Sequence, residues 1–124
     1  MATLDIALKE ALMIEGAIGA ALVDWGSGLA LGTAGGSREL DLATAAAGNT
    51  DVVRAKLRTM EMLNLTDESI EDILITLSGQ YHVIRPLTGR SGTGLFLYLA
   101  LDRKRANLAM ARRQLLLIEQ KLEV

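Results

Sequence analysis

The sequence has 124 residues, of which half are hydrophobic and one is proline, and its formal net charge is -2. These totals predict one folded domain, residues 1–124, and give no general attraction to nucleic acid or to an anionic membrane. Cysteine is absent, which excludes disulfides and thiolate chemistry, and because no signal peptide or membrane span is visible we expect a cytoplasmic protein.

The first half of the chain predicts a helix, a hairpin and a second, longer helix. The spacing of leucines indicates a helix over residues 4–15, with Thr3 as its N-cap. The stretch AIGAALVD, residues 17–24, is apolar on both faces of an extended strand, and WGSG followed by LALGT completes a hairpin. Residues 39–63 form the long helix, which carries one apolar stripe.

The second half predicts three strands and a final helix. DILITLSG from Asp72 and YHVIRPL from Tyr81 are strands joined by a tight turn around Gly79, and TGRSGTG, residues 88–94, is a loop. GLFLYLALD has an unbroken apolar core, which is typical of a central strand that is covered on both faces. Asp102 is then expected to cap a helix that continues to the C-terminus.

The resulting order, α-β-β-α-β-β-β-α, indicates an α+β fold with an antiparallel sheet and helices on both of its sides. In the first strand we expect Ile18, Ala20 and Leu22 on one face. Ala21 and Val23 then lie on the other face. Each apolar face needs a helical layer to cover it.

The glycine-rich stretch ALVDWGSGLALGTAGG raises the question of a nucleotide site. Gly26, Gly28 and Gly32 give the spacing G-x-G-x-x-x-G, without the lysine of a phosphate loop, and a strand rather than a helix follows. We interpret the glycines as a hairpin turn and, at Gly35 and Gly36, as a loop into the long helix. The sequence therefore predicts no nucleotide or other cofactor.

Candidate catalytic residues are few. His82 is the only histidine, so it lacks a second histidine for a metal site, and its place in a strand favours a hydrogen-bonded structural role. Ser27, Ser78 and Ser91 lie in expected turns, without the G-x-S-x-G setting of a hydrolase nucleophile. The sequence therefore predicts neither an enzyme nor a metal site.

A locally basic segment, RKRANLAMARR, covers residues 103–113. A helix with a solvated polar face is the simplest interpretation of this segment. A nucleic-acid-binding helix is the alternative, although the aromatic residues and the overall basic charge that such binding uses are missing.

The long helix carries an outer row that differs from an ordinary exposed face. At about 100° per residue, this row lies away from the apolar stripe and consists of Ala43, Ala47, Thr50, Arg54 and Arg58. Its first half is small and its second half is basic. Chance and helix propensity are one explanation, and a close-approach seam for another helix, flanked by arginines, is the one that we favour.

With its elements in this order, the chain resembles the roadblock/dynein light-chain family, and most of all the bacterial branch whose members partner Ras-like GTPases. The similar segments are ALVDWGSGLAL, LATAAAGNTDVVRAKLRTMEML, DILITLSGQYHVIRPL and GLFLYLALDRKRANLAMARRQL. The resemblance spans essentially the whole chain. It is carried by the order and character of the elements, with no catalytic signature.

This resemblance implies a five-stranded antiparallel sheet with the long helix on one face and the first and last helices on the other. It also implies a homodimer in which the edge strands that follow the long helix pair, while the two long helices pack side by side. The implied dimer interface comprises Ile73, Ile75 and Leu77 of the edge strand and Ala43, Ala47 and Thr50 of the outer row. An exposed apolar edge strand agrees with this arrangement, because such an edge is prone to aggregate unless it is paired.

The resemblance further implies a non-enzymatic regulator that binds a small Ras-like GTPase and can modulate its GTP hydrolysis. Asp51, Arg54 and Arg58 form the implied GTPase-binding surface, where the arginines would orient an acidic partner surface. A pure assembly scaffold without any effect on hydrolysis is the alternative within the same fold.

Overall fold

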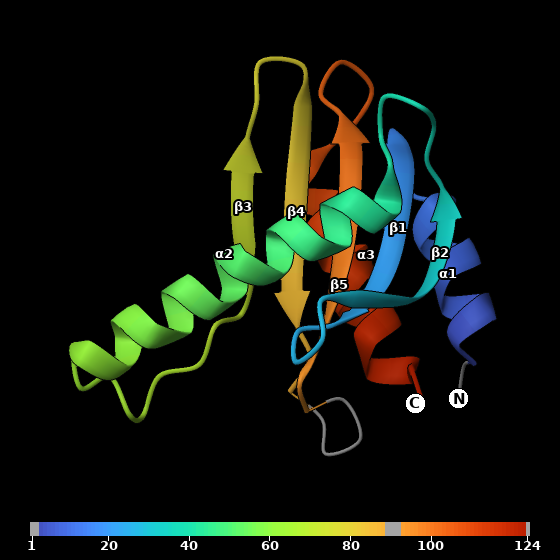
Figure 1. The fold of residues 1–124 in the computed structure, drawn as a ribbon. Helices are drawn as coiled ribbons and strands as arrows, with labels where there is room; N and C mark the ends of the chain where they lie inside the picture. The colour runs from blue at the N-terminus through green and yellow to red at the C-terminus, as the bar shows by residue number, and fades with distance from the viewer. Residues whose placement is uncertain (1–2, 89–92, 124) are drawn as a thin grey trace.

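The computed structural model describes residues 3–88 and 93–123, and Figure 1 shows one sheet between two helical layers. The five strands are antiparallel and lie in the order β2-β1-β5-β4-β3. The fold is α+β in the predicted order, with the elements α1 Leu4–Leu12, β1 Ala17–Asp24, β2 Leu29–Gly35, α2 Leu42–Met62, β3 Ile73–Thr76, β4 Gln80–Pro86, β5 Leu95–Asp102 and α3 Leu108–Lys121. Of the loop predicted at 88–94, residues 89–92 lie outside the described part of the chain.

Strand β5 occupies the middle of the sheet, as its unbroken apolar sequence predicts. Its side chains alternate between two cores. Leu97 and Leu99 lie in the core beneath α1 and α3, whereas Phe96 and Tyr98 lie in the core beneath α2. The two helical layers follow from this pattern, because a strand that is apolar on both faces must be covered twice.

Strand β1 departs from the predicted alternation at its start. Ile18 was expected on the same face as Ala20 and Leu22, but it packs against the α2 core, while the other two lie in the α1/α3 core. The register between β1 and β5 shifts between Ala17 and Gly19. An extra residue in one strand of a pair changes the face on which the neighbouring side chains lie.

The helix ends agree only in part with the prediction. Thr3 caps α1 as expected, but the helix ends at Leu12, three residues before the predicted end. Asp102 does not cap α3; it remains in β5 and its carboxylate accepts a backbone N–H of the following turn. Asn107 is the N-cap instead. Both side chains are good caps, and the turn between them decides which one is used.

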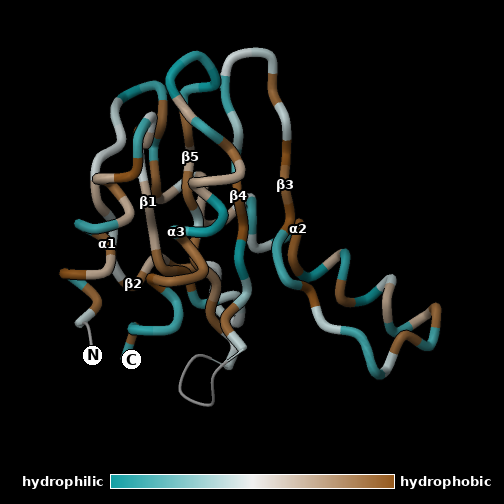
Figure 2. The backbone as a smooth tube through the Cα atoms, turned by 180° about the vertical axis from the view of Figure 1, so that it is seen from behind, coloured by the Kyte–Doolittle hydropathy of each residue, from teal (hydrophilic) through white to brown (hydrophobic). Residues whose placement is uncertain are grey.

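Helix α2 crosses its face of the sheet obliquely, and its C-terminal half extends past the edge strand β3 (Figure 1). Figure 2, which shows the opposite side, has the same projection and several apolar segments within it. Three large apolar side chains are exposed there, Met62, Leu63 and Leu65. The sheet therefore ends on this side in a strand without a further neighbour, beside a projecting helix.

Candidate interaction surface

The outer row of α2 is exposed at four of its five positions. These are Ala43, Ala47, Arg54 and Arg58. Thr50 is 2% exposed, and its hydroxyl donates to the Ala46 carbonyl at 2.7 Å. The β1–β2 hairpin covers Thr50, since Gly28 lies against it. The expectation that Thr50 lies on the outer face is therefore wrong, because a hairpin distant in sequence folds over that position.

Arg54 forms a hydrogen bond to the same hairpin, and helical periodicity could not predict this contact. Its Nη2 donates to the Gly26 carbonyl at 2.6 Å. Asp24 orders the hairpin, because its carboxylate accepts the Gly26 N–H at 2.9 Å and the Ser27 hydroxyl at 3.2 Å. One flank of α2, on the side of Ala47 and Arg54, therefore faces the hairpin.

The other two residues of the predicted GTPase-binding surface, Asp51 and Arg58, are exposed. Within the described residues, neither of them forms an ion pair. The structure thus places Asp51, Arg54 and Arg58 on one helix, with Arg54 held against the hairpin and the other two open to solvent.

The glycine-rich stretch forms a hairpin, as interpreted from the sequence, because strand β2 follows the turn directly. Gly28 has a φ of 78°, and Gly35 and Gly36 have φ values of 71° and 88° in the loop that leads to α2. Gly26, in the same turn as Gly28, does not have a positive φ. Positive φ is easily adopted only by glycine, so this conformation accounts for three of the five glycines in the stretch from residue 21 to residue 36.

Strand β3 has an open edge. Within residues 3–88 and 93–123 it pairs only with β4, and its hairpin closes through the Leu77 N–H, which donates to the Gln80 carbonyl at 2.8 Å. Hydrogen-bonded positions alternate along an antiparallel pair, so the backbone groups of Ile73 and Ile75 are directed at β4. Those of Leu74 and Thr76 are directed away from it, towards the open edge.

The side chains of β3 divide between the two faces of the sheet. Ile73 and Ile75 pack against the α2 core. Leu74 is exposed, and so is Leu77, which lies just beyond the end of the strand. Of the predicted interface residues on this segment, two therefore face α2 and one belongs to the turn.

A groove of about 590 Å³ lies beside this edge, and sequence analysis did not predict it. It is bounded by α2 and by the segment that returns from α2 to β3, and we call it the β3 groove. Its lining residues include Val52, Lys56, Met60, Leu65 and Ile73. Val52 and Lys56 stand on the flank of α2 opposite the one that faces the hairpin.

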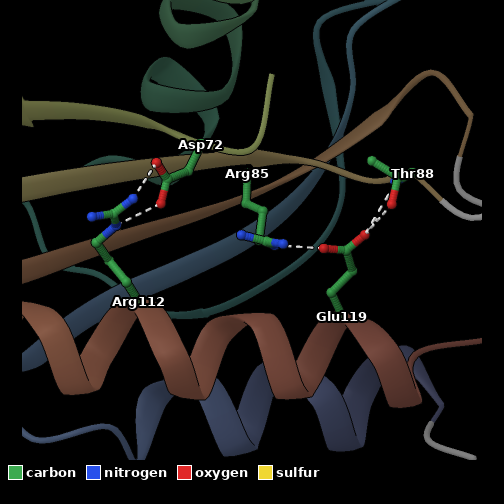
Figure 3. A network of polar contacts seen from close by, with 5 residues as sticks. All are labelled: Asp72, Arg85, Thr88, Arg112 and Glu119. Atoms are coloured by element: carbon green, nitrogen blue, oxygen red, sulfur yellow. Dashed lines mark hydrogen bonds and ion pairs between the residues drawn. The ribbon is translucent and has the colours of Figure 1, made fainter. Parts of the chain in front are cut away.

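The α3 helix is attached to the other face of the sheet by polar contacts, shown in Figure 3. Arg112 binds Asp72 through two hydrogen bonds of 2.7 and 2.9 Å. Arg85 of β4 binds Glu119, which also accepts the N–H and the hydroxyl of Thr88, each at 3.1 Å. In the basic segment 103–113, Arg112 is therefore engaged within the protomer.

Arg103, in the same basic segment, is engaged as well. It donates to the Leu77 carbonyl at 2.9 Å, and its guanidinium lies 5.0 Å from the centre of the Tyr81 ring. Two of the five arginine and lysine side chains of the segment are thus used for internal contacts. This arrangement favours the solvated structural helix over a nucleic-acid-binding helix.

His82 has the hydrogen-bonded structural role that the sequence indicates. Its Nε2 lies 2.7 Å from Gln80 Oε1, and its Nδ1 lies 3.2 Å from the Tyr98 hydroxyl. Burial lowers the pKa of His82 and raises the pKa of Tyr98 to about 12. Both shifts are caused by desolvation, because burial disfavours the charged form of each side chain.

Residues 3–88 and 93–123 contain no group of three or more metal-ligating side chains arranged to hold an ion. In the same ranges, no helix combines the length and the apolar content that a bilayer crossing requires. The features that the structure does bring together are the open β3 edge, the β3 groove and the exposed side of α2.

Comparison with solved structures finds the same fold in bacterial proteins. A Roadblock/LC7 domain from Streptomyces avermitilis matches with a TM-score of 0.77 and 13% identity, covering 96% of this chain and 93% of that one. MglB of Myxococcus xanthus matches with a TM-score of 0.72 and 16% identity over 92% of this chain and 77% of MglB. A structure described as MglB with a tetrameric arrangement matches with a TM-score of 0.66 and 17% identity over 93% and 86%.

No family model matches the sequence, and no significant relative is found among curated proteins. The identities of the structural matches are low, so what they establish is the fold. The structural neighbours are Roadblock/LC7 domain proteins, and the five-stranded antiparallel sheet with three helices has the roadblock architecture.

Proposed function

We propose that this protein is a non-enzymatic, homodimeric regulator that binds a small Ras-like GTPase. The observation that carries the proposal is the open β3 edge with an apolar groove beside it, on a roadblock fold. An unpaired strand edge is a surface that proteins normally cover or pair. The tetrameric arrangement described for one MglB structure supports self-assembly of this fold.

In the proposed dimer, the β3 strands of two copies pair and extend the sheet, so the segment that holds Ile73, Ile75 and the adjoining Leu77 lies at the contact. The new hydrogen bonds would form through the backbone groups of Leu74 and Thr76, because those of Ile73 and Ile75 are directed at β4. The projecting half of each α2 would then lie over the β3 groove of the other copy.

The helix seam follows from the same geometry. The sequence places it at Ala43 and Ala47, with Thr50 as the third residue, but Thr50 is enclosed within the protomer. The flank that carries Ala47 faces the hairpin, whereas the flank that carries Val52 faces the β3 groove. We therefore propose that Val52 and Lys56 contact the second copy. Ala43 and Ala47 then lie outside the helix contact of the dimer, beside the proposed GTPase-binding surface.

Thr76→Pro tests the strand pairing with little disturbance of the protomer. Proline removes one outward N–H from an edge strand, where proline is tolerated. We expect light scattering at micromolar concentration to show the wild type as a dimer of 13.3 kDa protomers and Thr76→Pro as a monomer. Thr76→Val, which keeps the N–H, should remain dimeric. A monomeric wild type would refute the dimer.

For the GTPase we propose docking on the exposed side of α2, around Asp51, Arg54 and Arg58. Arg54 and Arg58 are one helical turn apart, and like charges at that spacing repel slightly. An acidic partner surface would offset this repulsion and accelerate association. Because Arg54 also holds the Gly26 carbonyl at 2.6 Å, its substitution loosens the hairpin as well, and Arg58 is the cleaner probe.

Surface-binding kinetics with the cognate GTPase at two ionic strengths test this docking site. Arg58→Ala should lower the association rate at low salt, and the loss should fade at high salt because charges are screened. Arg58→Lys, which keeps the charge, serves as the matched control. Unchanged kinetics for the Arg54→Ala, Arg58→Ala double variant would exclude this surface. A GTP turnover assay then separates a regulator of hydrolysis from a pure assembly scaffold.

A further inference from the structure

The sheet has a second open edge, which is formed by β2. Strand β2 lies at the end of the sheet opposite to β3 and, among residues 3–88 and 93–123, pairs only with β1 (Figure 1). It has seven residues, LALGTAG, compared with four in β3. None of them is charged and none is proline, and these are two means by which proteins protect such an edge. Strand β2 can therefore accept a further strand along its outer side.

The outward backbone groups of β2 are centred on Thr33. The Gly36 N–H donates to the Ile18 carbonyl at 2.9 Å, so Gly36 is directed at β1. Because hydrogen-bonded positions alternate along an antiparallel pair, Ala34 and Gly32 are also directed at β1, and Thr33 is directed away from it. Thr33 is exposed, which agrees with this direction. Its N–H and its carbonyl can thus bind the backbone of an added strand.

The two faces of the sheet beside this edge differ. On the face covered by α1 the space is filled, because a Cβ at Gly32 would lie 2.9 Å from Leu8 Cδ1 and 3.0 Å from Leu4 Cδ2. On the face covered by α2, a hollow of about 520 Å³ lies between β2 and the loop that leads to α2, and we call it the β2 hollow. Its lining includes Ala30, Thr33, Arg38, Leu40 and Asp41. Alternate side chains of an added strand would therefore have room on the α2 face.

Arg38 brings a positive charge to the β2 hollow. It is exposed, and within the described part of the chain it has no ion-pair partner. The other charged lining residue, Asp41, caps α2, and its carboxylate accepts the Ala43 N–H at 3.0 Å and the Thr44 N–H at 3.4 Å. The positive end of the helix dipole offsets the charge of Asp41. The hollow therefore favours a carboxylate beside Arg38.

We propose that β2 binds an extended peptide segment of another protein, which adds to the sheet as a sixth strand. Strand addition of this kind takes its affinity from main-chain hydrogen bonds and its specificity from pockets for alternate side chains. Thr33 supplies the hydrogen bonds and the β2 hollow supplies the pocket. The segment should therefore carry an apolar side chain and a carboxylate on the face that meets the hollow. This site lies at the opposite edge from the proposed β3 dimer contact and does not depend on it.

A second copy of this chain fits the β2 edge less well than a flexible segment does. The register of β1 and β2 shifts between Leu22 and Val23, where β2 contains an extra residue, Leu31. Such a bulge bends an edge strand and limits edge-to-edge pairing between folded proteins. A flexible segment can follow the bend, whereas the β2 strand of a second copy carries the same bend and is held in its own sheet.

The first test compares two edge strands. Linear peptides of about ten residues, enough for one strand, are selected by phage display on the whole wild-type protein, and a synthetic copy of a selected peptide is the probe. Thr33→Pro removes the outward N–H, and the preceding residue, Gly32, has no Cβ to clash with the proline ring. We expect this variant to lower the peptide affinity, measured by fluorescence polarisation, at least about ten-fold. Thr33→Val, which keeps the N–H, and Thr76→Pro, which changes the β3 edge, should bind as the wild type does.

A second test uses the wild-type protein and peptides that are methylated at one backbone nitrogen each. In an added strand every second N–H is directed at β2, so binding should be lost with a period of two along the peptide. General apolar binding has no such period. Arg38→Ala should weaken a peptide that carries a carboxylate about three-fold at low salt, and Arg38→Lys, which keeps the charge, should not.

Several outcomes would overturn the inference. One is that no peptide is selected, and another is that Thr33→Pro, shown by circular dichroism to be folded, binds the peptide as tightly as the wild type. Loss of binding in Thr76→Pro alone would place the peptide at β3 instead. If Thr33→Pro does not fold, the methylated peptides decide, and losses without a period of two exclude strand addition. Self-association of the wild type that Thr33→Pro abolishes would make a second copy the occupant of the edge.

Discussion

The two helical layers are attached to the sheet by different means. Helix α3 is fixed by charged hydrogen bonds, from Arg112 to Asp72 and from Glu119 to Arg85 and Thr88. Helix α2 is held by a buried apolar face and by one polar link from Arg54 to the hairpin. Its C-terminal half also leaves the sheet altogether (Figure 1). The α3 layer therefore has more polar attachments to the sheet than the α2 layer, which in our proposal is the side that meets partners.

The largest effect that we predict separates the two flanks of α2. Val52→Glu should weaken the dimer by at least about 100-fold, because an unpaired charge in a close contact costs several kcal/mol. Ala47→Glu, on the flank beside the hairpin, should change the dimer little. Analytical ultracentrifugation measures both. If Ala47→Glu dissociates the dimer and Val52→Glu does not, the helices of the two copies contact each other through the outer row, as the sequence predicts.

The next prediction concerns the attachment of α3. Glu119→Ala leaves Arg85, whose side chain is 14% exposed, without its partner. Breaking a buried pair on one side costs about 3 kcal/mol of unfolding free energy. Arg54→Ala removes one exposed hydrogen bond from the α2 layer and should cost about 1 kcal/mol or less.

Urea unfolding at neutral pH gives both values. Glu119→Gln serves as the control, since it keeps the shape and part of the hydrogen bonding of Glu119. If Arg54→Ala destabilised the protein as much as Glu119→Ala, the two layers would be equally anchored, and the comparison between them would fail.

Sequence periodicity could predict the elements because each is specified locally. The unbroken apolar run from Leu95 to Leu101 requires burial on both faces, and this places β5 at the centre whatever surrounds it. The predicted cap of α3, Asp102, was wrong, because Asn107 is an equally good cap and lies nearer to the start of the helix. Ile18 was misplaced because the register shift beside Gly19 depends on how β1 meets β5.

The candidate site was less predictable, because it depends on contacts between distant segments. Thr50 is enclosed by a hairpin some twenty residues earlier, and Arg54 binds a carbonyl of that hairpin 28 residues away. The β3 groove is bounded by the segment from Leu65 to Asp72, most of which lies between the predicted long helix and the predicted strand that begins at Asp72. Periodicity assigns a residue to a face of its own helix, and it does not say which other segment covers that face.

A smaller effect is expected at Gly48, on the exposed side of α2. A Cβ at this position would meet no atom within 4 Å, so Gly48→Ala should stabilise the protomer by about 1 kcal/mol through helix propensity. Gly28→Ala is the matched contrast, because its φ of 78° is strained for alanine and should cost about 1–2 kcal/mol.

Thermal unfolding of the two glycine variants checks this prediction, and dimer affinity should be measured on the same samples. If Gly48→Ala stabilises the protein and leaves the dimer intact, that part of α2 is free for the GTPase. A dimer weakened by a single added methyl group would show that the copies approach each other at Gly48 and would move the seam to the outermost line of the helix.

The smallest effect concerns pH and the α2 side of the sheet, where His82 lies. Gln80 Oε1 can only accept, so Nε2 of His82 donates to it, and neutral Nδ1 accepts the Tyr98 hydroxyl. Protonation of Nδ1 would force that hydroxyl to accept and would leave its proton without a partner. Burial lowers the pKa of His82 below the ordinary value of 6.5, so the unfolded chain binds the proton more readily. The free energy of unfolding should therefore fall as pH drops through about 6.5 and level off below the folded-state pKa.

Urea unfolding between pH 7.5 and 5 measures how the free energy of unfolding changes with pH. His82→Gln should reduce this slope. Tyr98→Phe should largely keep it, because desolvation of His82 remains its cause. An unchanged slope in His82→Gln would assign the pH dependence to other groups and leave the α2 side without a pH-sensitive contact.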